Sequence, residues 1–301
     1  MSKDNTIQVN KKSRNVHFIR NIKDNIPLLI ISDIHFDSLG CDHISLKKHL
    51  DIIKEKNGQI IIVGDLFDVM GCYKDPRTKG KDINPNYIDR EDSYLDLVIQ
   101  DTYEFLKPYK ENILLIGYGN HETNILKRRD TDPIKRVVRR LNQKGGKDVA
   151  VGAYGGWIRF FIERKEGGNT RDFTLGYHHG SGGGAYRSKG ILKSQMDAME
   201  FPDVDLYVSG HDHNKIYDPS NQQWLLSKTG KIYNKTLHWL KTGTYQKPVT
   251  DMGWAVEKKF ISKPVGGWFC DLKRIRYTIN NQEYEYLRPI IYPALPFRQY
   301  I

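Results

Sequence analysis

The 301-residue sequence has few cysteines and no long apolar run. Its 3 cysteines are odd in number and widely separated, which argues against a disulfide framework and a CxxC motif, so we expect all of them to be reduced. Runs such as residues 28–31 are far shorter than the roughly 18 residues of a membrane-spanning helix. No secretory signal and no internal repeat is visible, and we therefore predict a cytoplasmic protein that makes no contact with a membrane.

The charge is strongly positive. Lys and Arg total 47 against 36 Asp and Glu, giving a formal net charge of +11. Excess positive charge attracts phosphate-bearing partners, although charge that only serves solubility would give the same number. Apolar residues make up 39% of the chain, the ordinary share for a globular protein with one large domain or two small ones.

Five short runs rich in Ile, Leu and Val each end at a side chain that can bind a metal ion. These runs, at 28–32, 60–64, 113–119, 173–177 and 206–210, lead into Asp33, Asp65, Asn120, the pair His178 and His179, and His211. They predict strands buried on both faces, with helices between them at 45–55, 93–106, 133–141 and 191–199. This alternation favours an α/β fold in which the carboxyl ends of the strands bring the polar residues together.

The polar clusters read DIH at 33–35, GDLFD at 64–68, GNHE at 119–122, HHG at 178–180 and GHDH at 210–213. Carboxylate, imidazole and amide ligands without a thiolate suit Mn²⁺, Fe or Zn²⁺. There are too many ligands for one ion, and they fit two ions about 3.5–4 Å apart if one carboxylate bridges them. That spacing suits phosphoryl transfer.

These five ordered motifs resemble those of the calcineurin-like metallophosphoesterases: DxH, GDxxD, GNH followed by Asp or Glu, a His before Gly, and GHxH. The resemblance implies a four-layer αββα sandwich of two mixed sheets flanked by helices, the metallophosphoesterase fold. It also implies two divalent ions, with Mn²⁺ expected and Fe or Zn²⁺ as alternatives. One ion would be held by Asp33, His35, Asp65 and His213, and the second by Asp65, Asn120, His179 and His211. The family pattern further implies His121 as general acid, with Asp68 as its orienting partner.

Some assignments within the motifs have alternatives. His178 and His179 would point to opposite faces of a strand, so only one of them is expected to bind metal. His179 directly precedes Gly, as the family ligand does, and His178 is the alternative. Three further carboxylates are expected to form hydrogen bonds around the ligands or in turns: Asp37, Glu122 and Asp212.

Two basic segments suggest a substrate rich in phosphate. The glycine-rich loop after His179 looks like the HHGSGGG sequence of bacterial and phage-encoded members of the superfamily, and it contains Arg187 and Lys189. Arg128 and Arg129 precede a predicted helix in which like-charged residues lie four positions apart, and a bound anion would offset the repulsion between them. We predict that these four residues bind substrate. The alternatives are a solvated basic face and, for the loop, an ordinary surface loop or a dinucleotide-binding turn.

The predicted function is hydrolysis of phosphate esters by metal-activated water, on DNA, RNA or a nucleotide. The alternatives are a phosphomonoesterase for phosphoproteins or small metabolites, a non-catalytic scaffold, and a nuclease subunit with an ATPase partner. Val69 follows Asp68 where the protein Ser/Thr phosphatases carry Arg, which counts against a protein phosphatase.

The expected domains are a basic N-terminal segment at 1–23, the catalytic domain at 24–250 and a β-rich extension at 251–301 packed on the same domain. Aromatic residues in the C-terminal third could stack on bases, although core packing is their expected role: Trp224, Tyr233, Trp239, Tyr245 and Trp254.

Overall fold

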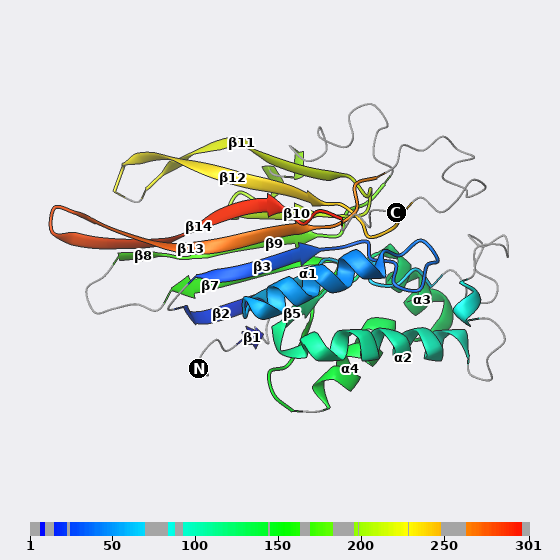
Figure 1. Cartoon of the computed structure of the whole chain (residues 1–301). Helices are drawn as coiled ribbons and strands as arrows, with labels where there is room; N and C mark the ends of the chain where they lie inside the picture. Colours follow the sequence, from blue (N-terminus) through cyan, green and yellow to red (C-terminus); the bar gives the residue numbers. More distant parts are fainter. Residues whose placement is uncertain are drawn as a thin grey trace.

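The computed structural model describes residues 7–9, 15–22, 25–69, 84–87, 93–143, 145–162, 169–182, 196–197, 199–227, 229–247 and 263–296. Within these residues two mixed seven-stranded sheets pack face to face, and the labelled helices lie on one side of the pair (Figure 1). The predicted α/β architecture of two mixed sheets flanked by helices is confirmed.

The sheet that the helices cover, here called the helix-covered sheet, has the strand order β6-β5-β4-β3-β13-β14-β8. Its strands are β3 (Ile26–Ile31), β4 (Gln59–Ile62), β5 (Ile113–Ile116), β6 (Ala150–Val151), β8 (Asn169–Arg171), β13 (Trp268–Ile279) and β14 (Gln282–Pro293). β3 to β6 are parallel, and β13 pairs antiparallel with β3. The strands expected in the C-terminal extension therefore lie inside this sheet, and the division of the chain into domains stays a prediction.

The second sheet, here called the outer sheet, has the order β1-β2-β7-β9-β10-β12-β11. Its strands are β1 (Ile7–Val9), β2 (Val16–Ile22), β7 (Gly155–Ile162), β9 (Phe173–His178), β10 (Leu206–Ser209), β11 (Lys215–Leu226) and β12 (Ile232–Thr242). β9, β10 and β12 are parallel, so the carboxyl ends of β9 and β10 meet at one edge. The β11–β12 and β13–β14 hairpins extend beyond the rest of the sandwich (Figure 1).

The helices are α1 (His43–Glu55), α2 (Tyr94–Leu106), α3 (Asn120–Arg129) and α4 (Pro133–Asn142), with 3-10 turns η1 (Pro85–Tyr87) and η2 (Lys107–Asn112). Asp42, Ser93 and Asp132 cap α1, α2 and α4 by accepting from backbone N–H groups in the first turn. The predicted helices at 45–55, 93–106 and 133–141 are therefore confirmed. The one predicted at 191–199 lies largely outside the described residues.

The motif-bearing strands are buried on both faces. Leu28 and Ile30 of β3 pack against the outer sheet, whereas Leu29 and Ile31 pack against the helices, and all four side chains are fully buried. Successive side chains of a strand point to opposite faces, so two apolar environments require the unbroken apolar run that the sequence shows. A smaller cluster that includes Tyr207 covers the far face of the outer sheet.

The C-terminal aromatic residues divide between core and surface. Trp239 and Tyr245 are fully buried, which confirms core packing for these two. Trp224 and Tyr233, near the tip of the β11–β12 hairpin, are 75% and 45% exposed, and Trp254 lies outside the described residues. No described helix combines the length and apolar character needed to cross a membrane.

Candidate metal centre

The five motifs meet at one end of the sandwich. β3, β4 and β5 bring Asp33, Asp65 and Asn120 from the helix-covered sheet, and β9 and β10 bring His179 and His211 from the outer sheet. The resulting groups of possible metal ligands each have atoms within 4.8 Å of one another: Asp33, His35 and His213; His35, Asp65 and His121; and Asp65, His179 and His211. Both sheets are therefore needed to assemble the cluster.

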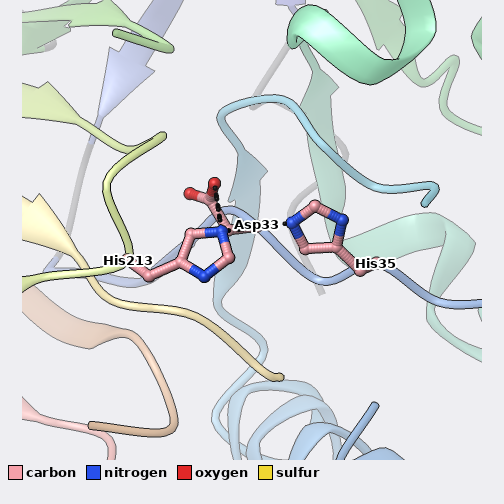
Figure 2. Close-up of side chains that lie close together, drawn as sticks. All are labelled: Asp33, His35 and His213. Carbon is pink, nitrogen blue, oxygen red and sulfur yellow. Dashed lines mark hydrogen bonds and ion pairs between the residues drawn. The ribbon is translucent and has the colours of Figure 1, made fainter. Parts of the chain in front are cut away.

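The first group is formed by Asp33, His35 and His213, whose side chains face one another (Figure 2). The Nε2 atom of His213 lies 3.4 Å from Asp33 Oδ1 and 3.3 Å from the Nε2 atom of His35. The Nδ1 atom of His35 lies 3.0 Å from Asp68 Oδ1, and a carboxylate that accepts the Nδ1 proton leaves the Nε2 lone pair for the centre of the group.

The second group is formed around Asp65. His179 Nε2 lies 3.1 Å from Asp65 Oδ2, and Asn120 Oδ1 lies 3.2 Å from His179 Nε2 and 2.8 Å from His211 Nδ1. The carbonyl oxygen of Val63 can only accept, so His179 carries its proton on Nδ1, which is 2.9 Å away, and directs Nε2 toward the group. Asp65 belongs to two of the three groups, the one with His179 and His211 and the one with His35 and His121, and His35 in turn belongs to the first group.

His178 and His179 differ sharply in their surroundings. His179 is fully buried in the cluster, whereas the Nδ1 atom of His178 accepts the backbone N–H of Gly180 at 3.0 Å. The His178 ring packs against Tyr154 at a centroid distance of 5.1 Å. Of the two histidines, only His179 belongs to a group that could hold an ion.

The backbone at the cluster is strained. Positive φ angles occur at five residues of the two groups: Asp33 (49°), His35 (48°), Asp65 (47°), His211 (75°) and His213 (57°). An L-residue reaches this left-handed region only at an energetic cost, and such residues gather where function requires a particular geometry. The Asp33 loop is held there by backbone N–H groups of Ile34 and His35 that donate to the carbonyl of Asp65, at 2.8 and 3.1 Å.

Two motif glycines allow the loops to approach each other. Gly64 has φ +87°, and a Cβ there would come within 2.7 Å of the backbone N of Gly119. A Cβ on Gly119 would in turn lie 2.5 Å from the backbone N of Asp65. Any larger residue at either position would push the Asp65 and Asn120 loops apart.

The buried carboxylates favour positive charge at the cluster. Burial alone lowers the pKa of His35, but its hydrogen bond to Asp68 and the charge of that carboxylate raise it to about 9. Burial also lowers the pKa of His179, but the charge of Asp65 and the hydrogen bond to it raise that pKa to about 9. Burial would raise the pKa of Asp65, yet the charges of His179 and His121 hold it well below its usual range. Without metal, protonated histidines balance the negative charge of the buried carboxylates. Bound divalent cations could balance the same charge instead.

The donors fit divalent cations. Asp, His and Asn oxygen and nitrogen atoms match the preference of Mn²⁺, Fe and Zn²⁺, and no thiolate is among them. The facing Nε2 atoms of His35 and His213 require a proton or a cation between them, because two lone pairs at 3.3 Å repel. Hydrogen bonds on the opposite nitrogens orient His35 and His179, as is usual for metal-binding histidines.

His121 belongs to the third group, with His35 and Asp65, and Asp68 lies beside it. The Nδ1 atom of His121 donates to the backbone carbonyl of Asp68 at 2.6 Å, and its Nε2 atom lies 3.9 Å from Asp65 Oδ2. The Asp68 carboxylate is closer to His35, at 3.0 Å, than to His121, at 3.6 Å. Asp68 therefore orients His121 through its main chain, and its side chain orients His35.

Asp37 and Glu122 hold the loops that carry these residues. Both are buried, and the Asp37 carboxylate accepts from the backbone N–H groups of Asp68 at 2.7 Å and Val69 at 2.8 Å. Glu122 accepts from the backbone of Asp65, Phe67 and Gly119 at 3.2, 3.0 and 2.8 Å. Neither carboxylate belongs to the candidate metal groups.

The structure describes two of the four predicted substrate-binding residues. Arg128 and Arg129 are exposed in the last turn of α3, where positive charge also complements the helix dipole. Arg187 and Lys189 lie outside the described residues. On α4, Arg136 pairs with Asp96 and Arg140 with Gln100, so two of the four basic side chains of this helix contact α2.

Residues that motif reading missed also position the cluster. The Thr244 hydroxyl and the backbone N–H of Tyr245 donate to the carbonyl of Asp33, at 2.8 and 3.0 Å. The ring of Tyr154 packs edge-on against His179, with centroids 5.4 Å apart. These residues belong to no motif, and the sequence alone gives no signal for them.

The family model of calcineurin-like phosphoesterases matches residues 26–215. The chain belongs to this family. The match covers all five motifs and ends two residues after His213. No curated protein matches the chain.

Solved structures similar to the chain include the following three. A conserved uncharacterised protein from Streptococcus pneumoniae, described as a predicted phosphoesterase, is 12% identical, with 89% of this chain and 100% of that chain covered and a TM-score of 0.30. A Vps29 double mutant from Entamoeba histolytica is 13% identical, with coverages of 89% and 99% and a TM-score of 0.36. GAP50 of Plasmodium, described as the anchor in the inner membrane complex, is 13% identical, with coverages of 92% and 91% and a TM-score of 0.38.

Proposed function

We propose that this calcineurin-like phosphoesterase hydrolyses phosphate esters with two divalent ions, Mn²⁺ being the expected metal and Fe or Zn²⁺ the alternatives. Asp33, His35, Asp65 and His213 would hold one ion; Asp65, Asn120, His179 and His211 would hold the other. The observation that carries the proposal is the convergence of these side chains from both sheets on strained backbone, with Asp33, His35, Asp65 and His179 buried. Ions bound there would offset the charge of the ester oxygens and lower the pKa of water.

His121 is proposed to donate the proton that the leaving oxygen needs. Its Nδ1 proton is engaged by the Asp68 carbonyl, so Nε2 is the atom that faces the cluster. Burial lowers the pKa of His121, which makes its imidazolium a stronger acid while reducing the protonated fraction at neutral pH. Asp68 supports this geometry as a positioning residue.

The proposed substrates are nucleic acids or nucleotides. The net charge of +11 and the exposed Arg128 and Arg129 support an anionic substrate, with Arg187 and Lys189 as further proposed contacts. A cytoplasmic location remains a prediction of the sequence. A phosphomonoesterase for phosphoproteins or small metabolites is the alternative that the same cluster could serve.

A metal-supplemented activity screen tests this proposal. Purified protein with Mn²⁺ should hydrolyse bis(p-nitrophenyl) phosphate, and a panel of DNA, RNA, nucleotides and phosphopeptides should identify the substrate class. Asp65→Asn should remove most bound metal and all turnover, because it alters both groups, whereas His121→Asn should slow turnover and keep the metal. Activity on phosphopeptides alone would contradict the proposed substrate. Metal content below one ion per chain with Mn²⁺ present would contradict the two-ion centre.

A further inference from the structure

A cavity of about 510 Å³ lies beside the metal cluster, at the edge of the sandwich near α3 and α4. Its lining includes Asn15, Tyr118, Thr123, Leu126, Lys135 and Tyr154. The volume falls in the range of about 300–1,000 Å³ that is usual for small-molecule sites. None of the proposed metal ligands lines this cavity, so it is a separate feature of the molecule.

Helix α3 carries residues of both the cavity lining and the metal cluster. Asn120, Thr123 and Leu126 are three residues apart, so their side chains follow one another along one face of the helix. This row begins at a proposed metal ligand and ends in the cavity wall. Tyr154, which also lines the cavity, packs against His179 at a centroid distance of 5.4 Å. A molecule with a phosphate at the cluster could therefore extend another part into the cavity.

The two tyrosines give the cavity fixed aromatic walls. Tyr118 donates its hydroxyl proton to Asp132 Oδ2 at 2.6 Å, and Tyr154 donates to the carbonyl of Gly180 at 2.7 Å. Since both hydroxyls are engaged, the rings are held in place and offer apolar carbon surface to a ligand. Rigid aromatic walls of this kind favour flat rings, which can pack against them without ordering the protein further.

A few polar groups stand among the apolar ones. Asn15, Thr123 and Lys135 line the same cavity as Leu126 and the tyrosines. An amide, a hydroxyl and an ammonium group can together donate to and accept from the polar edge of a heterocycle. Lys135 Nζ already pairs with Asp132 Oδ2 at 3.0 Å, and the Thr123 hydroxyl donates to the carbonyl of Asn120 at 3.3 Å. The preference for a nucleobase therefore rests on the aromatic walls, and these polar groups are further contacts for it.

We propose that this cavity binds the nucleobase of a phosphate ester whose phosphate lies at the metal cluster. The inference rests on the proposed phosphoesterase function and adds a subsite to it. It makes a nucleotide, or a nucleotide at the end of a chain, the preferred substrate, since the cavity of about 510 Å³ has room for a base. Stacking on aromatic side chains is sequence-tolerant, so the cavity would distinguish a nucleotide from a sugar phosphate more than one base from another.

The test compares AMP with ribose 5-phosphate, which lacks the base. Isothermal titration of the Mn²⁺-loaded protein should show AMP binding at least about 10-fold more tightly, within the range measured for base stacking. In Leu126→Trp, an indole would occupy the cavity, and the ratio of the two dissociation constants should fall to below about 3. Leu126 is 38% exposed, so the substitution is compatible with folding. Leu226→Trp, at a 71% exposed position on the β11–β12 hairpin, is the matched control and should keep the wild-type ratio.

The outcomes separate this inference from the function on which it rests. Equal binding of AMP and ribose 5-phosphate by a protein that hydrolyses esters would overturn the base subsite and leave the phosphoesterase standing. A ratio that Leu126→Trp leaves unchanged would place the base elsewhere and also overturn it. Hydrolysis of no ester, together with binding of neither ligand, would remove the proposed function and the subsite with it.

Discussion

Glu122 is expected to be essential for the fold of the metal centre even when no metal is bound. This side chain is fully buried and accepts three backbone N–H groups, from Asp65, Phe67 and Gly119. It therefore ties the loop after β4 to the start of α3. The perturbation is Glu122→Ala, which removes the acceptor of all three hydrogen bonds.

The expected loss can be worked out from these contacts. A buried donor left without an acceptor costs about 1–3 kcal/mol, so three such donors cost roughly 3–6 kcal/mol when water enters the space and serves some of them. Burial and the charge of Asp65 raise the pKa of Glu122 to about 7, so the substitution also removes an unfavourable charge. We therefore expect the lower end, about 3 kcal/mol. This is a large part of the 5–15 kcal/mol typical of a folded domain.

Urea unfolding in the presence of EDTA measures this loss without any contribution from metal. Glu104→Ala is the matched control, because the Glu104 side chain on α2 is 50% exposed, and it should change stability by less than about 0.5 kcal/mol. A loss for Glu122→Ala no greater than that of the control would refute the role assigned to its hydrogen bonds. A large loss with unchanged metal affinity would also be inconsistent with a loop that positions Asp65.

Three further predictions address other parts of the chain. His179→Asn should lower the Mn²⁺ content measured by elemental analysis, whereas His178→Asn should not, and equal losses would contradict the assignment of His179 as ligand. Glu285→Gln should cost about 3 kcal/mol in urea unfolding, because the buried charge of Arg274 would no longer be offset by a carboxylate. Burial raises the pKa of Glu285, but its hydrogen bonds to arginines lower the pKa below 4.5. The ion pair therefore stabilises the fold above about pH 4.5, and this stability is lost as the pH falls through the lowered pKa. Glu285→Gln should not show this loss at low pH. Arg136→Ala removes an exposed pair between α4 and α2 and should change stability by about 0.5 kcal/mol or less, so a loss above 1.5 kcal/mol would show a packing role.

Much of the fold near the cluster follows from local sequence. The apolar runs before Asp33 and Asp65 are long enough and uniform enough to predict buried strands, and β3 and β4 lie there. α3 was not predicted as a helix, because its ten residues are mostly polar. It begins at Asn120, and Glu122 supports its first turn by accepting the backbone N–H of Gly119. Such a helix is specified by contacts at its first turn more than by an apolar face.

The motifs by themselves were sufficient to predict the family. Asp33, Asp65 and His179 are donors of defined type, each placed within three residues of the end of a strand, and the strand end fixes the position of the backbone that carries the side chain. That pattern was sufficient for the family, which the match over residues 26–215 shows. It was sufficient because metal affinity depends on the types of ligand, which the sequence states outright.

The tertiary structure decided what local sequence cannot carry. Only the packing of the two sheets brings His211 Nδ1 to within 2.8 Å of Asn120 Oδ1, across 91 residues of sequence. Likewise, only the tertiary structure brings the Thr244 hydroxyl to the Asp33 carbonyl, where it holds the Asp33 loop. The direction of the Asp68 carboxylate, toward His35, was likewise beyond the motif. Contacts between residues far apart in the chain depend on how whole sheets and helices pack. The cavity beside Tyr154 is another result of that packing, and no motif marks it.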